Sequence, residues 1–206
     1  MAWIKTIGYD DAKGKLRAIY NRVKGPDNNV DNILMVHSLR PHTLEGHMTL
    51  YKYVLHHPQN KTPKWLLEAV GTYVSIMNEC TYCIEHHFLG LKRLVADDAR
   101  SEAMRTAFEA NETQPLLDAG HIRERDKAAL DYAARLTRTP TSITSTHLNK
   151  MRSTGMDDGE ILEINQVASY FNYANRTVLG LGVNTNGDIV GLSPNDSNDP
   201  ENWGHQ

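Results

Sequence analysis

The chain has 206 residues, of which 40% are hydrophobic and 14 are glycine, so it is long enough to bury the core of one globular domain. Its 25 acidic and 22 basic residues give a net charge of −3, which excludes a broadly basic nucleic-acid-binding protein. Two cysteines exclude a scaffold of many disulfides, and no apolar run approaches the ~20 residues that a membrane-spanning helix needs.

Helical signals follow one another along the chain. The first predicted helix is capped by Asp10 or Asp11 and stopped by Gly25. Apolar spacing and proline, glycine and N-cap signals then predict further helical segments, which lie at about residues 30–39, 41–55, 63–77, 83–94, 98–108, 111–120, 123–138, 143–152 and 158–179. Asp157 or Asp158 caps the last of these helices, and Gly180 and Gly182 close it.

No segment shows the sustained apolar and polar alternation of a strand, so the predicted fold class is all-α. We expect residues 1–186 to form one helical domain. Residues 187–206 are rich in Asn, Asp, Pro, Ser and Gly, and they predict an extended or disordered C-terminal arm. Trp203 near the end of this arm indicates docking, either on this chain or on a neighbouring subunit.

The residues that carry chemistry are concentrated in segment 78–87, which reads NECTYCIEHH. Each residue of a helix turns by about 100°, so Cys80, Cys83 and His87 share one face, with His86 beside it. Two thiols one turn apart can approach disulfide distance, and a helix start favours the thiolate form. The segment therefore predicts a redox dithiol with His87 as a proton-handling partner.

Other uses of two cysteines are open at this point. Attachment of c-type haem needs a histidine directly after the second cysteine, where Ile84 stands. A structural zinc site usually needs four ligands, and a second cysteine pair is absent. A thioredoxin-like motif follows a strand, whereas an apolar helix precedes Cys80 here. A structural disulfide or a pair of inert buried thiols is the simplest alternative.

Glu68 extends the motif to Glu68-x11-Cys80-x2-Cys83-x3-His87, which resembles the signature of the AhpD-like alkylhydroperoxidases in the carboxymuconolactone decarboxylase superfamily. Segments 10–16, 35–41 and 170–176 are similar to its branch of peroxidase-related proteins. The resemblance covers most of residues 1–183. It implies an AhpD-like helical bundle that forms homo-oligomers such as dimers, trimers or hexamers.

The resemblance also implies roles for the four motif residues. Cys83 would attack the hydroperoxide and become a sulfenic acid, and Cys80 would supply a proton and then form a disulfide with Cys83. Glu68 would act as a base toward Cys80, and His87 would relay protons. Tyr82 stands where well-studied members carry another polar residue, so it is a candidate substrate contact.

This relay requires a break in the chain. A straight helix would place the Cα atoms of Glu68 and Cys80 about 18 Å apart, too far for hydrogen-bond relay. We therefore expect the break at Asn78 and Glu79, which makes Cys80 the start of a new helix.

Three more residues are candidates for substrate contact. His37 belongs to a segment similar to the family, and it is one of five histidines that precede the motif, at positions 37, 42, 47, 56 and 57. Asn172 and Arg176 lie one turn apart on the last predicted helix, where they can orient a substrate or stabilise a subunit contact.

These observations favour a thiol-dependent peroxidase that reduces organic hydroperoxides. The alternatives are a disulfide reductase or thiol oxidoreductase acting on a protein, a decarboxylase or lactone-handling enzyme on the same scaffold, and a non-enzymatic oligomeric stress or binding protein. The redox pair argues against the decarboxylase hypothesis, because enzymes of that kind do not depend on such a pair.

We expect no cofactor and no metal, because the Cys80–Cys83 disulfide is the redox group. We expect the partners to be a small hydroperoxide and a dithiol reductant or a lipoyl or thioredoxin-like protein, with no nucleic acid and no membrane. The first residues lack the apolar stretch of a secretory signal, so the expected location is cytoplasmic.

Overall fold

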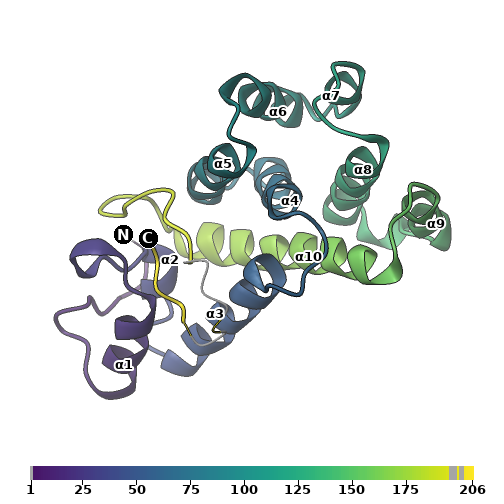
Figure 1. Cartoon of the computed structure of the whole chain (residues 1–206). Coiled ribbons are helices and arrows are strands. Elements are labelled where there is room, and N and C mark those ends of the chain that lie inside the picture. Colours follow the sequence, from purple (N-terminus) through teal and green to yellow (C-terminus); the bar gives the residue numbers. More distant parts are fainter. Residues whose placement is uncertain (1, 195–198, 200–201) are drawn as a thin grey trace.

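The computed structural model shows a chain of helices joined by short connections (Figure 1). It describes residues 2–194, 199 and 202–206, and in these residues the β-structure is one isolated bridge between Pro194 and His205. The all-α prediction is therefore confirmed. The helices are α1 (Gly14–Val23), α2 (Asn32–Met35), α3 (Pro41–His56), α4 (Lys64–Met77), α5 (Thr81–Val95), α6 (Asp98–Ala110), α7 (Gln114–Asp118), α8 (Glu124–Arg138), α9 (Ser145–Ser153) and α10 (Asp158–Leu181), with 3₁₀ turns at Pro26–Asn28 and Pro140–Ser142.

Helix α4 is the centre of the core. Its residues from Leu66 to Ser75 are all buried, and it packs against α5, α8 and α10. A helix that is apolar around most of its circumference needs neighbours on every side. Figure 1 shows how α10 supplies one of them, because it runs along the molecule beneath α4. Helix α10 also packs against α3.

The close approach of α4 to α10 depends on Gly71. A Cβ atom added to Gly71 would overlap the ring of Phe171. Gly71→Ala is therefore expected to lower the free energy of unfolding by about 1–3 kcal/mol through overpacking. Gly180→Ala in α10 is the matched control, since its added Cβ would meet no described atom within 4 Å apart from the backbone of its own helix. That change is expected to stabilise the helix by about 0.5–1 kcal/mol. Urea denaturation measures both, and a Gly71→Ala protein as stable as the wild type would contradict this packing.

Helix α10 begins and ends as the sequence predicts. The Asp157 carboxylate accepts a hydrogen bond from the Glu160 backbone N–H at 2.9 Å, and the Glu160 carboxylate accepts one from the Asp157 N–H at 3.0 Å. This capping box satisfies two donors at the start of the helix. Gly182 ends it in the left-handed conformation, with φ at 63°.

Helix α1 begins later than predicted. Its N-cap residue is Lys13, so the expectation that Asp10 or Asp11 caps it is wrong. The reason is a turn before the helix, in which the backbone N–H of buried Ala12 donates to the carbonyl of Tyr9 at 3.2 Å. Both aspartates belong to this turn, which precedes the N-cap Lys13, and the start of the helix has no side-chain cap.

The described part of the C-terminal segment packs on the helical domain. The Asp188 carboxylate accepts the Asn32 backbone N–H at 3.1 Å at the start of α2. Trp203 is buried, with the Arg22 guanidinium 3.7 Å from its ring centroid. Trp203 therefore docks on its own chain. Residues 195–198 and 200–201 of the predicted arm lie outside the described residues. Among the described helices, none has the length and apolarity to cross a bilayer.

Candidate active site

The chain breaks between α4 and α5 at the position that the relay requires. Helix α4 ends at Met77, and Glu79 adopts the left-handed conformation with φ at 56°. The Cys80 N–H donates to the Ser75 carbonyl at 2.9 Å, and the Glu79 N–H donates to the Ile76 carbonyl at 3.0 Å. This pair of bonds is a Schellman motif, which ends a helix and turns the chain. Cys80 consequently becomes the N-cap residue of α5.

The two cysteines lie side by side at this new helix start. Their Sγ atoms are 2.8 Å apart, both thiols are free, and the exposed fractions of Cys80 and Cys83 are 0% and 3%. Asn175 of α10 is fully buried nearby, where it donates to the Ser75 hydroxyl and accepts from the Asn78 amide. These bonds connect the end of α4 to α10 and fix the position of the pair.

Glu68 and His87 form a second pair across the α4–α5 hairpin. The Glu68 carboxylate lies 2.9 Å from Nδ1 of His87, and both side chains are largely buried. Burial alone would raise the pKa of Glu68, but the charge and hydrogen bond of His87, together with the charges of His56 and Arg93, hold that pKa below its ordinary value. Glu68 is therefore ionised at neutral pH. Its hydrogen bond goes to His87, and it makes none to Cys80, the predicted partner.

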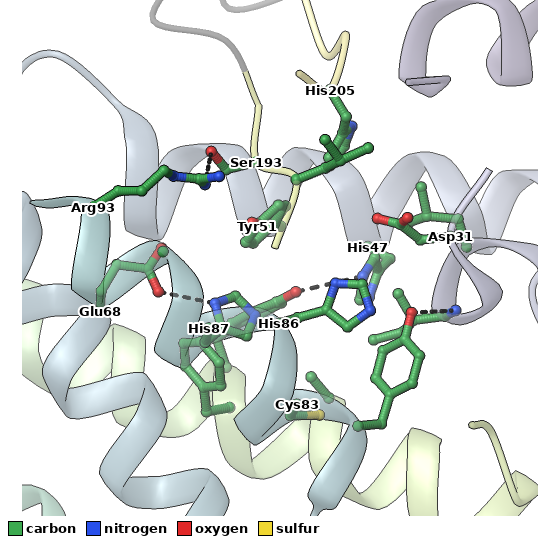
Figure 2. Close-up of a pocket in the computed structure, with 18 residues that line it drawn as sticks. Asp31, His47, Tyr51, Glu68, Cys83, His86, His87, Arg93, Ser193 and His205 are labelled. Carbon is green, nitrogen blue, oxygen red and sulfur yellow. Dashed lines mark hydrogen bonds and ion pairs between the residues drawn. The ribbon is translucent and has the colours of Figure 1, made fainter. Parts of the chain in front are cut away.

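Both pairs face one small cavity, shown in Figure 2. Cys83 lies at its floor, with Glu68 and Arg93 on one side, Asp31 on the other, and His205 of the C-terminal segment above (Figure 2). The cavity measures about 40 Å³. Cys83, Glu68 and His87 line it, whereas Cys80 lies behind Cys83. Of the two sulfurs, only that of Cys83 belongs to a residue of the cavity wall.

The two thiols have different acidities. The hydrogen bond with Cys83 is the main cause that lowers the pKa of Cys80 below its ordinary value, against the effect of burial. Burial raises the pKa of Cys83 well above its ordinary value, and the thiol of Cys80 adds to the rise. Cys80 is therefore the more acidic of the two thiols, and the thiol that faces the cavity is the weaker acid.

Tyr82 lines the cavity, but its hydroxyl serves the C-terminal segment. It donates to the Asp188 carboxylate at 2.7 Å and accepts the Ile33 backbone N–H at 3.2 Å. His37 does not line this cavity. Its Nδ1 lies 3.0 Å from the Thr43 hydroxyl, and its ring lies 5.0 Å from that of His47, which does line the cavity.

Asn172 and Arg176 also lie outside the cavity wall. The Asn172 side chain accepts from the Asn78 amide at 3.1 Å and donates to the Thr137 hydroxyl at 3.0 Å. Arg176 donates to the carbonyl and side chain of Asn172, both at 2.8 Å. These bonds connect α10 to the end of α4. The predicted contact of Asn172 and Arg176 with a substrate stays a prediction.

Sequence reasoning missed an acidic cluster on the far side of the cavity. His86 lies 3.5 Å from the Asp188 carboxylate, and Asp31 lies close by. Burial raises the pKa of Asp31 to about 6, with the Asp188 charge adding to the rise and His86 opposing it. These residues are far apart in the sequence, so no local pattern could have brought them together.

Buried histidines predict sensitivity to acid. Burial lowers the pKa of His47 to about 3, and the charges of His37 and His205 add to the fall. Burial likewise lowers the pKa of His56 and of His205, each to about 4. Below pH 6.5 these histidines bind protons in the unfolded chain but stay neutral in the folded one. The free energy of unfolding therefore decreases as the pH falls. For His47 the loss between pH 7.5 and 4.5 is about 3 kcal/mol.

His47→Gln is therefore expected to flatten the pH dependence of the free energy of unfolding by about that amount. His42→Gln, at an exposed position of the same helix, should leave the dependence unchanged. Urea denaturation at the two pH values measures the difference. An equal loss in the wild type and in His47→Gln would contradict the prediction.

Within the described residues, no group of three or more His, Cys, Asp or Glu side chains is arranged to hold a metal ion. The expectation that the site works without a metal stays a prediction.

No family model matches the sequence, and no curated protein matches it significantly. Solved structures are similar in fold. An uncharacterised peroxidase-related protein with an alkylhydroperoxidase AhpD core, from Ralstonia eutropha JMP134, superposes with a TM-score of 0.72 at 16% identity, covering 89% of this chain and 91% of that one. An uncharacterised peroxidase-related protein from Silicibacter sp. TM1040 gives a TM-score of 0.66 at 23% identity, covering 78% of this chain and 80% of that one.

A third similar structure is a cysteine-to-alanine variant of the debrominase Bmp8 in complex with 2,3,4-tribromopyrrole, with a TM-score of 0.66 at 16% identity, covering 88% of this chain and 90% of that one. The fold therefore occurs in proteins described by more than one activity. The sequence-based prediction of an AhpD-like helical bundle is confirmed by the first two structures, and the chain has the all-α AhpD-like fold.

Proposed function

We propose that this protein is a thiol peroxidase that reduces organic hydroperoxides with Cys80 and Cys83. The observation that carries the proposal is the contact between the two sulfurs, 2.8 Å apart, at a cavity that also holds the Glu68–His87 pair. A nucleophile, a resolving thiol and a proton-handling pair therefore meet within one small space.

The first step begins with the proton on Cys83. Because the pKa of Cys80 is lowered and that of Cys83 is raised, Cys80 ionises before Cys83, and its thiolate takes the proton from Cys83. The Cys83 thiolate then attacks the terminal oxygen of the hydroperoxide. A new S–O bond forms, the O–O bond breaks, and an alkoxide leaves. The protonated ring of His87 gives its proton to the alkoxide, and the negative charge of Glu68 stabilises that protonated ring beforehand.

The second step joins the two sulfurs. Cys80 attacks the Cys83 sulfenic acid, the S–O bond breaks, and the oxygen leaves as water with the proton from Cys80. In sum, one hydroperoxide and two thiols give one alcohol, one water and one disulfide. An external dithiol resets the pair. That this dithiol is small or belongs to a lipoyl or thioredoxin-like protein, and that the chain forms a homo-oligomer, are further proposals.

Burial of both sulfurs disfavours the alternative of a disulfide reductase acting on a folded protein, because such a partner cannot reach either sulfur without opening the site. One of the similar structures is a debrominase, so a second activity to test is the release of bromide from a brominated pyrrole. No contact in this cavity favours that reaction over reduction of an O–O bond.

Steady-state assays test the proposal. Wild-type protein with dithiothreitol should consume cumene hydroperoxide and form the alcohol in equal amounts. In parallel, 2,3,4-tribromopyrrole with the same dithiol should release no bromide. Absence of hydroperoxide consumption, or bromide release as the faster reaction, would contradict the proposed peroxidase.

A further inference from the structure

The cavity beside Cys83 is too small for an organic substrate. Its volume of about 40 Å³ is far below the ~300–1,000 Å³ of small-molecule sites. A hydroperoxy group fits such a space, but its organic substituent does not. A bulky hydroperoxide therefore needs a second space that connects with the first.

A larger cavity adjoins the first one. It measures about 430 Å³, within the ~300–1,000 Å³ range of small-molecule sites. Glu68, Gly90, Arg93 and Ser193 line both cavities, so they form the junction between them. Leu55 and Leu94 add apolar surface to the larger cavity. The two cavities together provide a narrow chamber for the reacting oxygens and a wider one for an organic body.

Gly90 keeps the junction open. A Cβ atom on Gly90 would lie 3.7 Å from Cδ and from Oε1 of Glu68, which is ordinary contact distance. Alanine therefore fits at this position of α5, whereas a larger side chain would extend into the junction beside the Glu68 carboxylate. The helix does not require glycine at this position, so the missing side chain serves to leave the junction open.

Arg93 places a positive charge at the same junction. Its guanidinium donates to the neutral Ser193 hydroxyl at 3.2 Å (Figure 2), and no ion pair joins it to a carboxylate in the described part of the chain. Within the described residues, its other four N–H groups make no hydrogen bond, so they can bind a ligand. Lys64 adds a second positive charge to the larger cavity. The opposing carboxylate of Glu68 is engaged with His87.

We propose that the substrates are organic hydroperoxides that carry a carboxylate. This inference rests on the proposed peroxidase function. The hydroperoxy group lies in the small cavity against Cys83, the organic body passes Gly90 into the larger cavity, and the carboxylate binds the planar guanidinium of Arg93 through paired hydrogen bonds.

A matched pair of substrates tests the charge. Cumene hydroperoxide and its para-carboxylate differ only in the anionic group. Wild-type kcat/KM is expected to be about tenfold higher for the carboxylate, equivalent to about 1.4 kcal/mol. Arg93→Gln should remove this preference mainly through KM. Lys92→Gln, on the same helix with its ammonium paired to Asp98 and Glu102, should keep it. Equal kcat/KM for both substrates in the wild type would overturn the proposal and leave the peroxidase function standing.

The junction has its own test. Gly90→Leu should lower the ratio of kcat/KM for cumene hydroperoxide to that for hydrogen peroxide about tenfold, while Gly90→Ala should preserve the ratio and the fold. An unchanged ratio in a folded Gly90→Leu protein would overturn the proposed path.

A binding measurement separates this inference from the catalytic one. Calorimetry with para-isopropylbenzoate, which has no O–O bond, should show binding to the wild type and about tenfold weaker binding to Arg93→Gln. A protein that binds this anion without consuming peroxide would refute the peroxidase function alone. Absence of binding, or equal binding to both proteins, would overturn the carboxylate site.

Discussion

Replacing Cys83 by serine is expected to lower kcat/KM for organic hydroperoxides about a thousandfold or more, because the reacting nucleophile is removed. Cys83 is the cysteine that lines the cavity, and a serine hydroxyl at this position cannot form a sulfenic acid. Consumption of cumene hydroperoxide in the presence of dithiothreitol measures the loss. Activity of the Cys83→Ser protein within a few fold of the wild type would contradict the assigned role.

Cys80→Ser is the informative companion variant. It retains the attacking sulfur but lacks the resolving thiol, so peroxide should convert Cys83 to a sulfenic acid that persists and reacts with dimedone. A dimedone adduct on Cys83 in Cys80→Ser would support the order of the two steps. An adduct on Cys80 in Cys83→Ser that formed faster than the adduct on Cys83 in Cys80→Ser would reverse the roles.

Glu68→Gln is expected to lower kcat for hydroperoxide reduction about a hundredfold, the usual contribution of general acid–base catalysis. Glutamine keeps a hydrogen-bonding group beside His87 but removes the negative charge that lies 2.9 Å from its ring. The change should leave KM nearly unaltered, since the proposed contact of the substrate carboxylate is with Arg93.

Glu85→Gln is the matched control for this change, because Glu85 is exposed on the same helix as His87. Stopped-flow measurement of disulfide formation follows the chemical step in both variants. If Glu68→Gln formed the disulfide as fast as Glu85→Gln, the Glu68–His87 pair would have no part in proton transfer.

The order of helices was predictable because periodic apolar residues and terminal signals repeat along the chain. Helix α10 is the clearest case, since the Asp157 cap and Gly182 both have their expected conformations. The break before Cys80 carries a weaker local signal, because Glu79 adopts a conformation that usually calls for glycine. Only the requirement that Glu68 and the cysteines approach one another predicted it.

The site was predictable where its residues are close in the sequence. Glu68, Cys83 and His87 lie on one helical hairpin, and the motif placed them together. Gly90 and Arg93 line the same cavity about one and two turns beyond His87 on α5. Their place in the cavity wall depends on Glu68 and Ser193, which no local pattern connects to them. The fold alone brings the C-terminal segment to this cavity. Long-range contacts of this kind leave no periodic signal in a single sequence.

The central claim is that peroxide oxidises Cys80 and Cys83 to a disulfide. Mass spectrometry of the intact, fully reduced protein after one equivalent of cumene hydroperoxide tests it directly, with peptide mapping after alkylation. The expected result is a mass about 2 Da lower, with Cys80 and Cys83 linked and protected from alkylation until a dithiol is added. Two thiols that remain fully alkylated after exposure to peroxide would contradict the account.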